Sequence, residues 1–195
     1  MTSLMDIPGL GAFRPLDERA CMAGISTGRL IAALGGRAFG RDPSTDHLTA
    51  SAFVFTPDRA MLLLLHHAKL NLWLQPGSHC DGDHDTAGVA ARELGEETGL
   101  TGLRPLVPWI VDIDIHLIPA RGDKAAHRHF DLRYAFEAER EALLFRNHES
   151  RDLQWVTLDR IEDVTRAPSI LVARAIAENL ARCVSFPKAL LELSG

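Results

Sequence analysis

Hydrophobic and polar residues alternate along two neighbouring segments in the second half of the chain. Over residues 111–117, Val, Ile and Leu take every second position, and Asp or His stands between them. Over residues 127–136, His, Asp and Arg alternate in the same way with Phe, Leu, Tyr and Phe. A period of two is typical of a β-strand with one apolar and one polar face. If the two strands pair as an antiparallel hairpin, their polar faces coincide.

Runs rich in apolar and β-branched residues predict further strands. These are residues 48–55, 61–66 and 71–74, with a last short strand at Trp155-Val156. The first two runs are separated by Thr56-Pro57-Asp58-Arg59, a sequence suited to a hairpin connection. A loop rich in Gly, Asp and His then follows over residues 78–85.

Three segments predict helices. They are residues 17–34, a helix that begins at about Thr86, and residues 170–180 with an apolar stripe. Strands and helices therefore mix irregularly along the chain, which favours an α+β fold over a doubly wound sheet. An α/β/α sandwich with a mixed sheet satisfies this order.

Three carboxylates gather at the end of the second predicted helix. Glu93 and Glu97 are one turn apart and Glu96 lies beside them, so all three share one side of the helix. Gly99 stands where a left-handed C-cap residue is expected. Like charges at this spacing destabilise an isolated helix. A hard divalent cation such as Mg²⁺ reverses that effect, because it prefers carboxylate oxygen.

Composition narrows the class of protein. The 195 residues suit one domain or one domain with an extension, and the net charge of −5 disfavours extended binding to nucleic acid. The three cysteines form no CxxC pair, and the N-terminus shows no secretory leader. The sequence contains no run of eighteen apolar residues, so it predicts no membrane-spanning helix. We expect a cytoplasmic protein that binds no membrane. The sequence does not decide between a monomer and a homodimer.

The segment from Ser78 to Leu100 resembles the Nudix box, whose pattern is Gly-x5-Glu-x7-Arg-Glu-U-x-Glu-Glu-x-Gly-U, where U is aliphatic. All seven defined positions of its C-terminal part match: Arg92, Glu93, Leu94, Glu96, Glu97, Gly99 and Leu100. The preceding Leu74-Gln75-Pro76-Gly77 is similar to the family's usual lead-in. Flanking segments extend the resemblance over most of residues 47–160.

Two positions depart from this pattern. The first box glycine is Ser78 and the first box glutamate is His84. Serine keeps the backbone carbonyl that the family offers to metal, so it is damaging only where a positive φ or close approach excludes Cβ. The carboxylates of the same loop, Asp81, Asp83 and Asp85, are candidates to replace the glutamate. His84 is a poor Mg²⁺ ligand, because Mg²⁺ favours oxygen.

The resemblance implies hydrolysis of a diphosphate bond in a nucleotide or a nucleoside-diphosphate-linked small molecule, with Mg²⁺ or Mn²⁺ as cofactor. It assigns Glu93, Glu97 and the Ser78 carbonyl to the metal. It makes Glu96 a ligand or the water-activating base, and Arg92 an orienting partner of Glu96.

Residues outside the box complete the predicted site. The resemblance implies a catalytic base either in the box or on a later loop. On the later loop the candidates are Glu149, which we select, and Asp152. His116, His129 and Asp131 lie on the polar strand faces. We expect them in the nucleotide or diphosphate pocket or in an extra metal site, and the alternative is a solvated hairpin.

The predicted organisation is an N-terminal helical extension over residues 1–46 and a Nudix hydrolase domain over residues 47–195 that includes the C-terminal helix. One alternative function is a non-catalytic nucleotide-binding or regulatory Nudix domain, favoured by Ser78 and His84. Another is diphosphate isomerisation of isoprenoids, which requires a cysteine and a glutamate beside a hydrocarbon pocket. No convincing pair of that kind stands out in the sequence.

Overall fold

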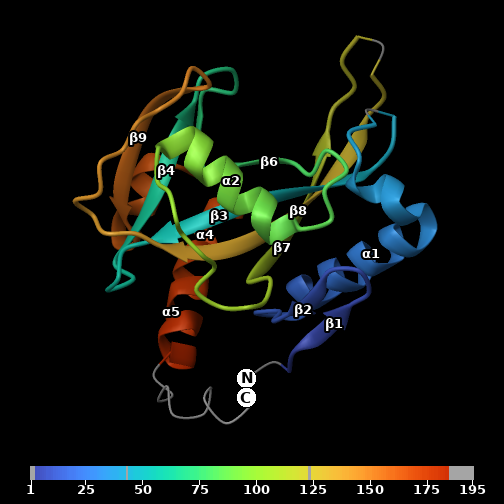
Figure 1. Cartoon of the computed structure of the whole chain (residues 1–195), viewed down its shortest axis with the longest axis horizontal. Helices are drawn as coiled ribbons and strands as arrows, with labels where there is room; N and C mark the ends of the chain where they lie inside the picture. The colour runs from blue at the N-terminus through green and yellow to red at the C-terminus, as the bar shows by residue number, and fades with distance from the viewer. Residues whose placement is uncertain (1–2, 43, 123, 185–195) are drawn as a thin grey trace.

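A mixed seven-stranded sheet forms the centre of the protein, with helices on both faces (Figure 1). The computed structural model describes residues 3–42, 44–122 and 124–184. The strands are β3 (His47–Phe55), β4 (Met61–His67), β5 (Leu72–Leu74), β6 (Gly77–His79), β7 (Asp112–Ile118), β8 (His127–Glu137) and β9 (Ser150–Thr157). The predicted α/β/α sandwich is therefore confirmed. The short strand β6 was predicted as loop, and β9 is longer than predicted.

Strand β3 organises the sheet. It runs parallel to β8 along its whole length, from His47 opposite His129 to Phe55 opposite Glu137. It meets β4 only at Phe55 opposite Leu62, beside the predicted hairpin connection, and then leaves it. Beyond that point β3 pairs with β6, and β4 pairs with β5 and β9. The hairpin is thus confirmed at its turn, but its strands separate to hold different partners.

The predicted hairpin of the two alternating segments is confirmed as β7 and β8. Asp112 lies opposite Arg133, and His116 opposite His129, so the polar faces coincide. This face is not a solvated surface along its length, because Asp112 and Arg133 are fully buried. The Arg133 guanidinium donates to the Asp112 carboxylate at 2.9 Å and to that of Asp131 at 3.0 Å. Buried charges of this kind are tolerated because each is paired.

Helices cover the two sheet faces. They are α1 (Glu18–Leu34), α2 (Thr86–Thr98), α3 (Ile161–Val164), α4 (Pro168–Leu171) and α5 (Ala173–Val184), with 3₁₀ turns at η1 (Gly35–Phe39) and η2 (Leu158–Arg160). Helix α2 packs on the β3 face that carries Ala50, Ala52 and Val54. Helix α5 packs on the opposite face with Phe53 and Phe55. The single C-terminal helix predicted over residues 170–180 is thus two helices, and the second extends to Val184. Among the described residues, no helix is both long and apolar enough to cross a membrane.

The N-terminal segment is attached to the main core. It contains a hairpin that the sequence did not predict, β1 (Met5–Ile7) with β2 (Gly11–Phe13), ahead of α1. Phe13 and Phe39 of this segment are buried in the same apolar cluster as α2. The division between residues 1–46 and 47–195 stays a prediction. Residues 185–195 of the second predicted unit lie outside the described residues.

Strand β6 approaches β3 so closely that only glycine fits at its first position. A Cβ atom on Gly77 would lie 2.4 Å from Cβ of Ser51 and 2.7 Å from the carbonyl oxygen of Ala50. Both contacts are far shorter than van der Waals distance, and one of them is with backbone. The pairing of β6 with β3 therefore requires the glycine.

We expect Gly77→Ala to lower the free energy of unfolding by about 1–3 kcal/mol, because β6 must move away from β3. Urea unfolding measures the change. Gly28→Ala is the matched control, since its Cβ would meet only Ile7 at 3.9 Å within helix α1. That control should leave stability unchanged or raise it by up to about 1 kcal/mol. A Gly77→Ala protein as stable as wild type would contradict this account of the sheet.

Candidate active site

Helix α2 is fixed at both ends by its own sequence. The Asp85 carboxylate accepts a hydrogen bond from the Gly88 amide at 3.0 Å and caps the start. Gly99 ends the helix with φ of 77°, in the left-handed conformation predicted for it. Val89, Ala90 and Leu94 of α2 are buried against the sheet. The acidic residues of the last turns are thereby held at a fixed place beside the sheet.

The three predicted carboxylates differ in exposure. Glu97 is buried, Glu93 half-buried and Glu96 exposed. The Glu97 carboxylate accepts a hydrogen bond from the Gly77 amide at 2.9 Å, which joins α2 to β6. Burial, together with the charges of Glu93 and Glu149, raises the pKa of Glu97 to about 7 against the opposing hydrogen bond from the Gly77 amide. Burial and the charge of Glu96 likewise raise the pKa of Glu93.

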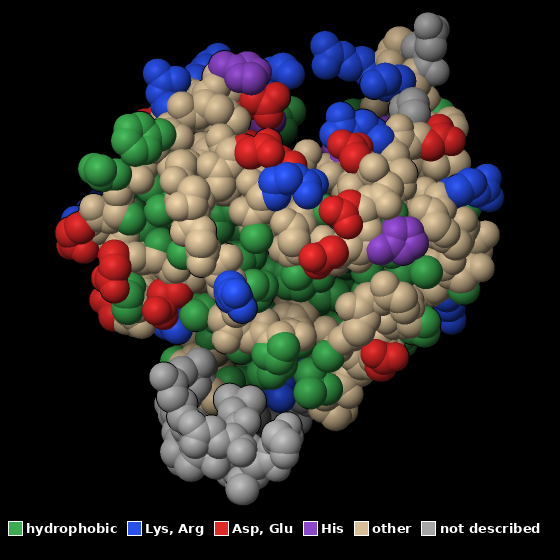
Figure 2. All heavy atoms as spheres, in the orientation of Figure 1, with side chains coloured by type: hydrophobic (Ala, Val, Ile, Leu, Met, Phe, Trp, Pro, Cys, Tyr) green, Lys and Arg blue, Asp and Glu red, His purple; other side chains and the backbone are tan. Residues whose placement is uncertain are grey.

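Arg92 does not pair with Glu96, the partner that the resemblance implied for it. Arg92 forms ion pairs with Asp83 at 3.5 Å and with Glu93 at 3.9 Å, rather than with Glu96. The chain turns Arg92 toward the loop that precedes α2, so the pairing predicted from helical spacing is wrong. In Figure 2, acidic side chains lie over the part of the molecule where Figure 1 shows α2.

These carboxylates fit a hard divalent cation. All their donor atoms are oxygen, as Mg²⁺ and Mn²⁺ prefer. Desolvation and mutual repulsion raise the pKa of Glu97 and Glu93, and a bound dication would relieve both. The donor set and its electrostatic strain therefore agree with the metal that the box implies.

Ser78 occupies an ordinary strand position. It lies within β6 opposite Ala50 of β3. Among the described residues, the non-glycine positions with positive φ are Arg59, Asn71 and Asp81. A positive φ is thus excluded as a reason why serine would damage this position. Ser78 directly follows Gly77, whose amide is bound to Glu97, so its backbone stands beside the carboxylates.

His84 has a different occupation from the glutamate that it replaces. Its ring stacks on Phe39 of η1, with centroids 4.0 Å apart and planes 11° apart. Asp85 caps the helix and Asp83 pairs with Arg92, whereas Asp81 pairs with Arg41 at 2.8 Å. Of these three candidate replacements, Asp81 is the one whose charge raises the pKa of Glu93.

Glu149 lies beside the box helix although it is more than fifty residues distant in sequence. Its negative charge raises the pKa of both Glu93 and Glu97. The segment is anchored because the Glu149 carbonyl accepts a hydrogen bond from the Ala68 amide at 2.8 Å. The side chains of Glu149 and Asp152 are both exposed, and Asp152 lies within β9 opposite His66 of β4.

The predicted pocket residues of β7 and β8 divide into two environments. Asp131 is buried and belongs to an internal network. Its carboxylate accepts hydrogen bonds from Thr49 (3.0 Å), Ser51 (2.8 Å), Gln75 (3.1 Å) and Arg133 (3.0 Å). These bonds satisfy it without a ligand, so substrate contact by Asp131 stays a prediction. His116 is exposed, and its Nδ1 lies within hydrogen-bond distance of the Asp114 carboxylate, at 2.9 Å.

His129 belongs to a histidine cluster that the sequence did not reveal. The cluster consists of His47 at the start of β3, His79 at the end of β6, and His127 and His129 on β8. Burial, with the charges of Arg41 and neighbouring histidines, lowers the pKa of His79 to about 4. Burial and neighbouring histidines together lower the pKa of His129 to about 3. Alternation showed the two β8 histidines, but only the register of β3 with β6 and β8 brings in the others.

A cavity of about 570 Å³ lies away from the box helix. It is bounded by α1, β7, β8 and α4, and its polar lining includes Arg19, Asp114 and Arg133. None of its lining residues belongs to α2. The cavity thus does not mark the carboxylate site.

Comparison with known proteins places this geometry in a family. The family model described as "NUDIX domain" matches residues 45–175. The chain therefore belongs to the NUDIX domain family. Membership of this family places the chain in the class of pyrophosphohydrolases, which act on phosphorus-containing acid anhydrides. The comparison with curated protein sequences gave no match.

Solved structures agree with the fold. An E. coli dihydroneopterin triphosphate pyrophosphohydrolase is 14% identical, with a TM-score of 0.54 over 73% of this chain and 98% of its own. A C. elegans Ap4A hydrolase in a binary complex is 18% identical, with a TM-score of 0.50 over 69% and 97%. A NUDIX-family hydrolase from Clostridium perfringens is 19% identical, with a TM-score of 0.50 over 67% and 95%. At these identities the likeness is one of fold.

The raised pKa of Glu97 predicts a specific pH dependence of stability in the metal-free protein. Glu97 ionises near 4.5 when unfolded and at about 7 when folded. Between these values the folded protein keeps a proton that the unfolded chain has lost, so the contribution of Glu97 to stability falls as pH rises. Relative to wild type, Glu97→Gln should therefore gain up to about 1.4 kcal/mol for each pH unit in this interval.

Urea unfolding in the presence of a chelator, at a series of pH values, measures this difference. Glu141→Gln, at an exposed position, controls for the loss of one negative charge. A Glu97→Gln difference that stays constant between pH 4.5 and 7 would show that Glu97 has no raised pKa.

Proposed function

We propose that this protein is a Mg²⁺-dependent hydrolase that cleaves a diphosphate bond in a nucleotide or a nucleoside-diphosphate-linked small molecule. The observation that carries the proposal is the group of Glu93, Glu96 and Glu97, held on α2 beside β6. Two of these carboxylates have a raised pKa because they are partly desolvated and close to like charges. Such an arrangement is costly for stability alone, and a cation site explains it.

Glu93, Glu97 and the Ser78 carbonyl would hold the Mg²⁺, and Mn²⁺ suits the same oxygen donors. When bound, the ion supplies charge neutralisation at the diphosphate and lowers the pKa of a bound water. The Gly77 hydrogen bond orients the Glu97 carboxylate toward β6. This contact also sets the position of the Ser78 backbone next to Glu97, so both donors are ordered before substrate arrives.

An acidic residue beside these ligands would accept the proton of the attacking water. In hydrolysis, the water oxygen forms a bond to one phosphorus, the bridging P–O bond breaks, and a carboxylate accepts the proton that the water loses. Glu96 and Glu149 are the candidates, because both are exposed and both raise the pKa of Glu97 through their charge. Arg92 would hold the loop before α2 through Asp83 rather than orient Glu96.

The proposed substrate class is supported by the names of proteins that share the fold, and not by a ligand-binding residue of this chain. The names of the Ap4A hydrolase and the dihydroneopterin triphosphate pyrophosphohydrolase state substrates that contain phosphoanhydride bonds. His116 on β7 is the proposed contact to the substrate, together with Asp131 on β8, whereas His129, opposite His116, belongs to the histidine cluster. We further propose a small-molecule substrate and a cytoplasmic location.

A non-catalytic nucleotide-binding or regulatory role is the second candidate, because two box positions depart from the family pattern. His84 is engaged with Phe39 and brings no carboxylate to the site. Isoprenoid diphosphate isomerisation has less support. The cysteine of the box loop, Cys80, is fully buried, and burial raises its pKa to about 12.

Phosphate release from a panel of nucleotides and nucleoside diphosphate derivatives, with Mg²⁺ and with Mn²⁺, tests the proposal. We expect turnover on at least one compound and a loss of at least about 100-fold in kcat for Glu97→Gln, whose shape preserves the fold. Glu141→Gln should keep the wild-type rate. Binding without turnover across the panel would instead support the regulatory candidate. A Glu97→Gln enzyme with the wild-type rate would place the metal elsewhere.

The strand geometry of Ser78 predicts the effect of restoring the family's glycine. Ser78→Gly should leave kcat within about threefold of wild type, because only the backbone carbonyl is used and no positive φ is required. Steady-state kinetics on the substrate found above measure it. A loss of more than tenfold would mean that the serine hydroxyl has its own part in catalysis.

A further inference from the structure

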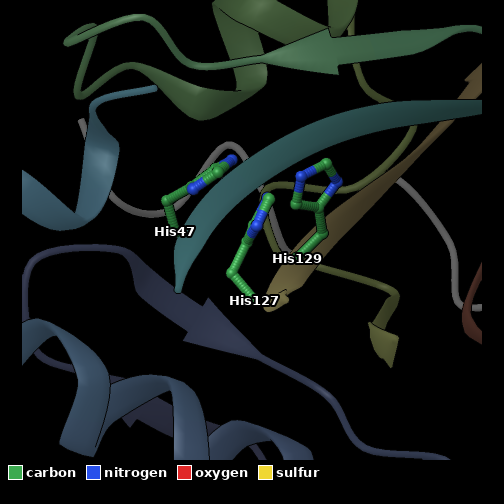
Figure 3. A group of neighbouring side chains, drawn as sticks. All are labelled: His47, His127 and His129. Carbon is green, nitrogen blue, oxygen red and sulfur yellow. The ribbon is translucent and has the colours of Figure 1, made fainter. Parts of the chain in front are cut away.

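Three histidine side chains converge at one end of the sheet, apart from the carboxylates of α2. His47 lies on β3, and His127 and His129 on β8. One ring nitrogen from each lies within 4.8 Å of one from each of the others. Figure 3 shows the three rings turned toward the same small space between the strand ends. The centroids are 4.6 Å apart for His47 and His129, and 5.1 Å apart for His47 and His127.

Hydrogen bonds on the outer side of two rings define their free nitrogens. His47 Nδ1 lies 2.9 Å from the Thr45 carbonyl oxygen, and His127 Nδ1 lies 3.0 Å from that of Ala125. A carbonyl oxygen only accepts, so each Nδ1 donates its proton. In the neutral imidazole, Nε2 then carries a lone pair. This outward N–H to a backbone carbonyl is the usual support of a histidine that binds metal.

The inner nitrogen of His47 has no hydrogen-bond partner among the described residues. The residue is only 1% exposed, and its Nε2 atom is buried. A buried polar nitrogen without a partner is unfavourable, because it has lost its hydrogen bond to water. The rings closest to His47 are those of other histidines. Adjacent imidazoles cannot all become protonated without repulsion, whereas their lone pairs can share one cation.

We propose that His47, His127 and His129 bind a transition-metal dication, with Zn²⁺ as the expected ion, at a site separate from the carboxylates of α2. Imidazole nitrogen is a preferred ligand of Zn²⁺ and a poor one of Mg²⁺. Two nitrogens that share a tetrahedral Zn²⁺ at about 2.1 Å stand about 3.4 Å apart. Since the ring nitrogens lie within 4.8 Å of one another, the side chains need to close by at most about 1.4 Å.

The backbone around the proposed ligands is held in place. His47 and His129 are register partners in the parallel pairing of β3 with β8. Next to them, the Asp46 carboxylate accepts hydrogen bonds from the Arg128 amide at 2.7 Å and from its Nε at 3.0 Å. The residue before His47 is thus fastened to the residue between His127 and His129. Such preorganisation reduces the free-energy cost of assembling a metal site.

His79 supplies a candidate for the fourth ligand and a link to the active site. Its ring centroid lies 5.1 Å from that of His47 and 4.9 Å from that of His129. It ends β6, two residues after Gly77 and one after Ser78. An ion held by this cluster would connect the ends of β3, β6 and β8, and so steady the strand that presents the Ser78 carbonyl.

Calorimetric titration of the metal-stripped full-length protein with ZnCl₂, in the presence of excess Mg²⁺, tests the proposal. Mg²⁺ occupies the oxygen donors of α2 and leaves the imidazoles free. We expect one equivalent of Zn²⁺ to bind, and the melting temperature to rise when it does. Substitution by Co²⁺ should give the strong visible absorption of tetrahedral coordination.

Variants distinguish this site from adventitious binding. His129→Ala and His127→Ala should each weaken Zn²⁺ binding at least about 100-fold. His148→Ala, which removes an exposed histidine, should bind like wild type, and so should Glu97→Gln. Circular dichroism checks that each variant folds. The titration of the wild-type protein tests the proposal even if a variant fails to fold. The proposal is overturned if wild type binds no stoichiometric Zn²⁺ in excess Mg²⁺. It is equally overturned if His129→Ala and His127→Ala bind as wild type does.

Discussion

The close contact of β6 with β3 is the constraint on which the site depends. Gly77 lies so near Ser51 and Ala50 that no side chain fits, and its amide is free to donate to Glu97. That hydrogen bond joins the last turns of α2, which also pack on the sheet through Leu94, to strand β6. The same short strand places Ser78 beside the carboxylates and His79 beside the histidines. If β6 moved outward, both groups of candidate ligands would lose their geometry.

Two chemically different groups are therefore arranged around one strand. On the side of α2 the donors are carboxylate oxygens whose pKa values are raised by burial and like charge, the environment that a hard cation relieves. At the end of β6 the donors are imidazole nitrogens, and burial lowers the pKa of His79 and His129 among them. Between them, Asp131 and Arg133 form a buried network that closes the sheet interior with paired charges. The carboxylates of α2 and the histidines at the end of β6 thus suit different cations, whereas Asp131 and Arg133 neutralise each other.

The sequence predicted the parts of this structure that depend on local spacing. Helical periodicity located the carboxylates of α2, and Gly99 marked its end. Alternation located β7 and β8. What it missed depends on contacts between distant segments: the β1–β2 hairpin, strand β6, the stacking of His84 on Phe39, and the direction taken by Arg92. The histidine cluster requires the parallel register of β3 with β8, which no local pattern in one sequence contains.

The central claim is that the carboxylates of α2 and the Ser78 carbonyl hold the catalytic metal. The most direct test is a crystal soaked with Mn²⁺ and a non-hydrolysable nucleoside diphosphate analogue, measured for anomalous scattering from manganese. The account predicts an anomalous peak bounded by Glu93, Glu97 and the Ser78 carbonyl, with the diphosphate beside it. A peak at another place, or none at α2 with the analogue bound, would contradict it.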